Sequence, residues 1–182
     1  NSENKEKFKK ILLAQKIQTI SEHLKQFIVE TSNEELIPII DESRPWIRTN
    51  DMSPWMTSKK TQPTEFSQIN NMVADSNFEA EFCQHLERMG KNQKILSWVK
   101  NDHLGFKIWY VFKGEIKTYY PDFIVKTDPE NFIIIETKGL KKDQDEFKWN
   151  AMKEWVIAIN NGNFGNWKFE SIFKKDEFHL IK

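Results

Sequence analysis

Two stretches of the sequence decide the fold: Tyr119–Val125, which reads YYPDFIV, and Phe132–Lys138, which reads FIIIETK. Both are rich in aromatic and β-branched residues, which favour strands. The second is apolar without interruption over four positions, which is typical of a central strand buried on both faces. Residues 127–131 (TDPEN) between them are turn formers. The two stretches therefore predict neighbouring strands joined by a short turn.

A short turn makes the two strands antiparallel, and its position sets their register. With the turn centred near Pro129, Val125 lies near Ile133. The same register sets Asp122 opposite Glu136. We therefore expect two carboxylates to meet at one end of the sheet.

Side chains alternate along a strand, so we expect Glu136 and Lys138 on one face, joined by Asp122, and Thr137 on the other. Repulsion between two close carboxylates is relieved by a proton, by a lysine or by a divalent cation. A bound cation suits phosphodiester hydrolysis, because it polarises the phosphate and activates water. The main-chain carbonyl of Thr137 and the carboxylate of Glu79 are candidate additional ligands.

The rest of the chain predicts helices around this pair and more strands beside it. Spacing near 3.6 indicates an amphipathic helix over residues 5–30, and residues 31–71 indicate a connector. Ser76 and Glu79 form a capping box that begins a second helix, which ends at Gly90. The pattern also predicts a helix over residues 143–160 and strands over residues 95–99, 106–112 and 167–173. The expected fold class is α/β, with a helical arm and connector over 1–74 and a mixed sheet flanked by helices over 75–182.

Composition excludes several classes of function. The chain has 182 residues, and its 27 Lys and Arg balance 27 Asp and Glu, so bulk charge indicates no polyanion partner. The single cysteine, Cys83, cannot form an internal disulfide, which favours a cytoplasmic protein. Apolar runs are too short to span a membrane. No P-loop is present, so we expect no ATP site in this chain. The sequence begins without a Met and without a signal peptide, which suggests that the chain is a piece of a longer protein.

The acidic pattern also has explanations that involve no catalysis. Glu-x-Lys also occurs at Glu3, Glu115 and Glu146, but only Glu136 ends an apolar strand that follows a Pro-Asp strand. A surface cluster of ion pairs remains an alternative, and Glu79 can serve as a capping residue alone. Three lysines are candidate contacts to a DNA backbone: Lys141, Lys142 and Lys148. Lys141 and Lys142 can instead belong to a solvated turn.

Pro121-Asp122 followed by Glu136-Thr137-Lys138 resembles the PD-(D/E)xK nuclease superfamily. The resemblance extends over about residues 65 to 170. Within the superfamily, this part of the sequence is most similar to the C-terminal nuclease region of type III restriction enzyme Res subunits. It rests on segments that follow in that family's order: Asp75–Glu79, Val99–Asn101, Leu104–Phe106, Tyr119–Val125 and Ile135–Gly139. Trp109 departs from the pattern, because a Pro is common there.

This resemblance implies a restriction-endonuclease-like fold and Mg²⁺-dependent cleavage of double-stranded DNA, with Mn²⁺ as an alternative metal. Asp122 and Glu136 would bind the metal, Lys138 would position water or stabilise the transition state, and Glu79 would be the upstream acid. The implied partners are a modification (Mod) subunit and a helicase region, absent from this chain, that would use ATP. A catalytically inactive DNA-binding or docking module of the same fold remains an alternative. A third reading is an assembly module that recruits a partner through its N-terminal helix.

Overall fold

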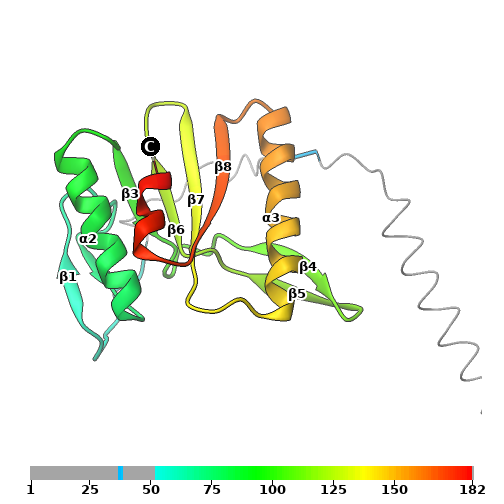
Figure 1. Cartoon of the computed structure of the whole chain (residues 1–182), viewed down its shortest axis with the longest axis horizontal. Helices are drawn as coiled ribbons and strands as arrows, with labels where there is room; N and C mark the ends of the chain where they lie inside the picture. Colours follow the sequence, from blue (N-terminus) through cyan, green and yellow to red (C-terminus); the bar gives the residue numbers. More distant parts are fainter. Residues whose placement is uncertain (1–36, 39–51, 182) are drawn as a thin grey trace, which may run out of the picture. The chain divides into compact units, whose positions relative to one another are not determined.

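The computed structural model describes residues 37–38 and 52–181, all of which belong to the unit Leu36–Lys182 (Figure 1). The expected helix over residues 5–30 lies outside the described residues. The described elements follow one another as β1 (Thr61–Pro63), β2 (Asn71–Val73), α2 (Asn77–Lys91), β3 (Ser97–Lys100), β4 (Ile108–Phe112), β5 (Glu115–Tyr119), β6 (Phe123–Lys126), β7 (Asn131–Thr137), α3 (Asp143–Asn161), β8 (Asn166–Ile172) and the 3-10 helix η2 (Lys175–Leu180).

The main sheet has the strand order β3-β6-β7-β8. Its first three strands are antiparallel, whereas β8 runs parallel to β7 after the crossover through α3. Successive residues of β7 face opposite cores: Ile133 and Ile135 pack in one cluster with Phe82 of α2, and Ile134 packs in another with Met152 of α3. The sheet therefore lies between α2 and α3 (Figure 1). The fold is mixed α/β, and the expected burial of β7 on both faces is confirmed.

The stretch Tyr119–Val125, expected as one strand, is two strands in two sheets. β5 ends at Tyr119 and pairs with β4 in a separate hairpin, while β6 begins at Phe123 and pairs with β3 and β7. Pro121 lies between them, and proline has no N–H to donate to a ladder. Its carbonyl instead accepts a hydrogen bond of 2.9 Å from the side-chain amide of Asn101. The prediction of one continuous strand was wrong for this reason.

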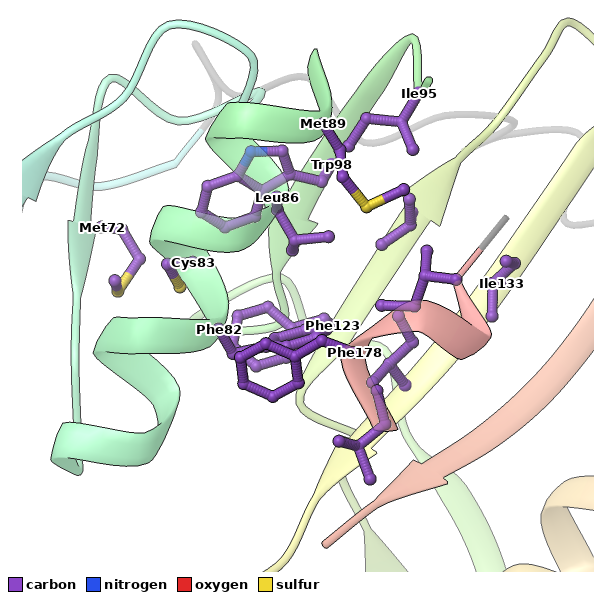
Figure 2. Close-up of a cluster of buried hydrophobic side chains, with 14 residues drawn as sticks. Met72, Phe82, Cys83, Leu86, Met89, Ile95, Trp98, Phe123, Ile133 and Phe178 are labelled. Carbon is purple, nitrogen blue, oxygen red and sulfur yellow. The ribbon is translucent and has the colours of Figure 1, made fainter. Parts of the chain in front are cut away.

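The helix α2 begins at the predicted N-cap, Ser76, but the Glu79 carboxylate accepts from the residue before the cap, so the predicted capping box is only half formed. The hydroxyl of Ser76 accepts a 3.1 Å hydrogen bond from the Glu79 N–H, and Oε2 of Glu79 accepts one from the Asp75 N–H, also 3.1 Å. The buried face of α2 then packs Phe82 against Phe123 and Phe178, with ring centres 5.2 and 5.1 Å away (Figure 2). This aromatic contact ties α2 to β6, the strand that follows Asp122.

The segment expected as a connector contributes to the same core. β1 and β2 pair antiparallel with Gln62 opposite Met72, and Met72 is buried beside Cys83 of α2 (Figure 2). The short length of these strands explains why no sustained period marks them in the sequence.

Candidate active site

The candidate site lies where β6 begins and β7 ends. Val125 pairs with Ile133 and Phe123 pairs with Ile135, so the predicted register is confirmed. The pairing ends there: Asp122 directly precedes β6, and Glu136 follows Ile135 in β7. The backbone at this point is held from the other side as well, because the Asn101 N–H donates a 2.7 Å hydrogen bond to the Asp122 carbonyl.

Asp122 directs its carboxylate to Thr137. Its Oδ2 accepts hydrogen bonds from the Thr137 N–H (2.8 Å) and hydroxyl (2.6 Å). Burial raises the pKa of Asp122, the Thr137 hydrogen bonds oppose that rise, and the charge of Glu79 adds to it. We expected Thr137 to face away from Asp122; the structure makes it the hydrogen-bond donor that holds this acid. The Oδ1 atom makes no hydrogen bond within the described part of the chain.

Glu136 is buried on the α3 side of the sheet, with 5% of its surface exposed. Its Oε2 accepts a 2.8 Å hydrogen bond from the hydroxyl of Tyr119. Burial first, and then the charge of Asp122, raise the pKa of Glu136 to about 7, although Tyr119 and Lys138 pull it down. Glu136 therefore exchanges a proton near neutral pH. A pKa in this range suits a group that loses its proton when a metal binds, or one that acts as a general acid or base.

Lys138 lies between two acids. Its Nζ is 3.7 Å from Oε1 of Glu136 and 3.1 Å from Oδ1 of Asp145, which is fully buried in the first turn of α3. Oδ2 of Asp145 accepts a 2.7 Å hydrogen bond from the Lys142 N–H. Burial alone would raise the pKa of Asp145, but the Lys142 hydrogen bond and the charges of Lys138 and Lys148 lower it. Asp145 therefore stays ionised and anchors the catalytic candidate Lys138.

The three lysines predicted to contact DNA lie in different surroundings. The Nζ of Lys148 is 3.4 Å from Asp145 Oδ1 and 5.4 Å from the centre of the Tyr119 ring, so this side chain turns toward the acids. Lys141 and Lys142 are exposed; Lys141 lies 3.8 Å from Glu146, and Lys142 precedes α3 as its N-cap.

Glu79 approaches the same region from α2, in contact with a lysine that the sequence analysis missed. The Nζ of Lys100, at the end of β3, lies 2.9 Å from Glu79 Oε2 and donates to the Val73 carbonyl and to Asp75. Burial would lower the pKa of Lys100, but hydrogen bonds to Asp75 and Glu79 raise it. A signal for this residue was present, because Lys100 has the strand phase of the buried Trp98. Tyr119 and Asp145 had no such signal, because only tertiary packing brings them to Glu136 and Lys138.

The donors present are those that hard divalent cations prefer, namely carboxylate oxygens. Within residues 52–181, however, no group of three or more His, Cys, Asp or Glu side chains is gathered tightly enough to hold a metal ion. The carboxylates of the site have other partners instead. Hydrogen bonds reach Oδ2 of Asp122 and Oε2 of Glu136, and Lys100 forms an ion pair with Oε2 of Glu79. The residues therefore fit a cation by their chemistry, and their side chains must shift to bind one.

Comparisons with family models, curated proteins and solved structures find no match to this chain. No helix among the described residues is long and apolar enough to cross a membrane. The functional argument therefore rests on the chain's own geometry.

Replacing Glu136 by Gln will change how stability depends on pH. The folded protein holds the Glu136 proton up to about pH 7, against an ordinary pKa of 4.5, so this stabilisation is complete below pH 4.5 and is lost as pH rises through 7. The wild-type free energy of unfolding should fall by about 3 kcal/mol over that interval through this group. Urea unfolding at several pH values should show no such fall in Glu136→Gln, whereas the exposed control Glu115→Gln keeps it. If the unfolding free energy of Glu136→Gln falls with pH as steeply as that of the wild type, the fall does not come from Glu136.

Replacing Asp145 by Asn will test the buried anchor. Asn can still accept the Lys142 N–H, but it removes the charge that faces Lys138 and Lys148. Breaking a buried ion pair on one side costs about 3 to 5 kcal/mol. Chemical denaturation should show a loss of this order in Asp145→Asn and less than about 0.5 kcal/mol in Asp143→Asn, an exposed acid of the same helical turn. Equal losses of unfolding free energy in the two variants would mean that Asp145 stabilises the fold no more than an exposed acid does.

Proposed function

We propose that this chain is a metal-dependent nuclease domain of the PD-(D/E)xK kind that hydrolyses phosphodiester bonds in DNA. One observation carries the proposal: Asp122 and Glu136 lie directly beyond the last pair of β6 with β7, Phe123 with Ile135, and the Lys138 ammonium lies 3.7 Å from Glu136. Two carboxylates and one lysine at a single strand end are the groups that cation-assisted phosphodiester hydrolysis requires.

The order of the elements supports the same proposal. A helix (α2), three antiparallel strands (β3, β6, β7), a crossover helix (α3) and a parallel strand (β8) follow one another in the chain. This order agrees with the restriction-endonuclease-like fold that the sequence resemblance implies. The β4 and β5 hairpin is inserted between the first two strands of the sheet and leads directly to Pro121-Asp122.

Each polar group has a role in this proposal. When bound, a divalent cation such as Mg²⁺ would polarise the phosphate and activate water. Asp122 Oδ1 and Glu136 Oε1 are the oxygens that would hold it, with the Thr137 carbonyl and Glu79 as additional candidates. Lys138, held by Asp145, places a positive charge beside Glu136, where negative charge develops on the phosphate. Lys148 adds a second ammonium on the same side.

The wider context follows from the resemblance. The proposed enzyme is the endonuclease part of a type III restriction enzyme that acts on double-stranded DNA in the cytoplasm, with a modification subunit and an ATP-driven helicase region as partners. The exposed Lys141 and Lys142 are the proposed contacts to the DNA backbone beside the site.

One observation favours the alternative of a catalytically inactive DNA-binding or docking module. The acids of the site already have partners in the described structure: Thr137 for Asp122, Tyr119 for Glu136 and Lys100 for Glu79. A module of this kind would bind DNA equally well in EDTA and in Mg²⁺ and would never cut it.

Cleavage of supercoiled plasmid in Mg²⁺ or Mn²⁺ tests the proposal. Asp122→Asn and Lys138→Ala should each slow cutting by at least about 100-fold, because each removes a group that acts on the transition state. Lys94→Ala, an exposed lysine beyond the other end of β3, should cut like the wild type. Equal cutting by all variants would indicate a contaminating nuclease. If the wild type does not cut without its helicase region, calorimetric metal binding at Asp122 and Glu136 decides between an intact site and the inactive module.

A further inference from the structure

The hairpin of β4 and β5 has an exposed apolar face. Val111 pairs with Ile116 and Trp109 pairs with Thr118, so these four side chains share one face of the two-stranded sheet. Trp109 is 59% exposed, Val111 52% and Ile116 74%. An indole and two branched side chains in adjacent exposed positions are costly to leave in water, which marks the face as a contact surface.

The opposite face of the hairpin is firmly packed. Ile108 and Tyr110 are buried in the core on the α3 side. The Phe112 ring meets the Phe147 ring of α3 edge to face, with centres 5.2 Å apart. The hairpin is therefore packed against α3 on this face (Figure 1).

The base of the hairpin is tied to the candidate site. The side-chain amide of Asn101 donates to the Phe106 carbonyl (2.7 Å) before β4 and to the Pro121 carbonyl (2.9 Å) after β5. At the end of β5, Tyr119 donates its hydroxyl to Glu136. The next residue, Tyr120, is 54% exposed and stands two positions before Asp122. A molecule bound on the outer face would therefore lie along the strand that leads to Pro121-Asp122.

The charge of the hairpin favours an anionic partner. From residue 107 to 119 it carries three lysines and one glutamate, and that glutamate, Glu115, pairs with Lys117 at 3.4 Å. Lys113 and Lys107 have no carboxylate partner among the described residues. The Lys107 ammonium lies 5.0 Å from the centre of the Trp109 ring. Because this ammonium lies over the ring, a base that stacks there replaces it, and the freed lysine can then pair with the phosphate of the same nucleotide.

We propose that this outer face binds unpaired nucleotides of the DNA next to the cleavage position, by stacking a base on Trp109. The proposal rests on the nuclease function for its choice of partner. A β-ribbon that reads duplex DNA needs side chains that hydrogen-bond to base edges. Among the four paired residues of the face, only the Thr118 hydroxyl and the Trp109 indole N–H are such groups. Stacking requires only the ring and the neighbouring charge. The surface therefore fits single-stranded segments better than a duplex groove.

Fluorescence anisotropy in EDTA tests this proposal without cleavage, using a labelled oligothymidine of about 16 nucleotides and a blunt duplex of equal length. Trp109→Ala should weaken binding of the oligothymidine by roughly 5- to 100-fold and leave the duplex within about a factor of two. Lys107→Ala should lower the salt dependence of oligothymidine binding by about one phosphate contact. The control Ile157→Ala, which truncates an exposed apolar side chain on α3, should change neither affinity.

Four results would overturn the proposal. The wild type could fail to bind oligothymidine, Trp109→Ala could bind it unchanged, or Trp109→Ala could weaken both DNAs equally. A wild-type dimer that Trp109→Ala or Ile116→Ser converts to monomer, as judged by sedimentation, would identify the face as a self-association surface and overturn it as well. The binding measurement is made in EDTA and requires no cleavage. A failure to cut plasmid in Mg²⁺ or Mn²⁺ therefore counts against the nuclease function alone.

Discussion

The pairing of β6 with β7 brings Asp122 and Glu136 to one end of the sheet, where both are largely withdrawn from water. Burying two carboxylates near each other is unfavourable unless donors or cations compensate. The surrounding polar structure serves this purpose. Thr137 donates twice to Asp122, and Tyr119 donates to Glu136. Thr137 follows Glu136 on β7, so the register that brings the two acids together also supplies the donor for Asp122, whereas Tyr119 comes from β5 of the separate hairpin.

The remaining compensation comes from lysines on the two sides of the sheet. On the α2 side Lys100 pairs with Glu79, and on the α3 side Lys138 and Lys148 meet around Asp145. Four acids (Glu79, Asp122, Glu136 and Asp145) thus face three ammonium groups, while Asp75 has the exposed Lys59 as a further partner. One additional positive charge balances the cluster. The proton on Glu136 supplies it near neutral pH; in the proposed enzyme a divalent cation, which brings two positive charges, would replace that proton.

Local patterns in the sequence predict the parts of this arrangement that depend on neighbouring residues. The turn around Pro129 sets the register, and Ser76 with Glu79 begins α2 as expected. The break at Pro121 was missed because the flanking residues favour strands on both sides, and only pairing partners show that the two strands belong to different sheets. Tyr119 and Asp145 were missed for a related reason, since their contacts span 17 and 7 positions along the chain to Glu136 and Lys138 and depend on how the hairpin and α3 pack.

The central claim is that Asp122 and Glu136 jointly hold a divalent cation, and calorimetric titration with Mn²⁺ or Mg²⁺ near pH 7 tests it most directly. The account predicts a binding event in the wild-type chain that releases a proton, so its enthalpy depends on the buffer, because the metal must displace the proton of Glu136. Asp122→Asn should abolish this event, and Asp143→Asn should preserve it. No binding by the wild type, or equal binding by Asp122→Asn, would contradict the account.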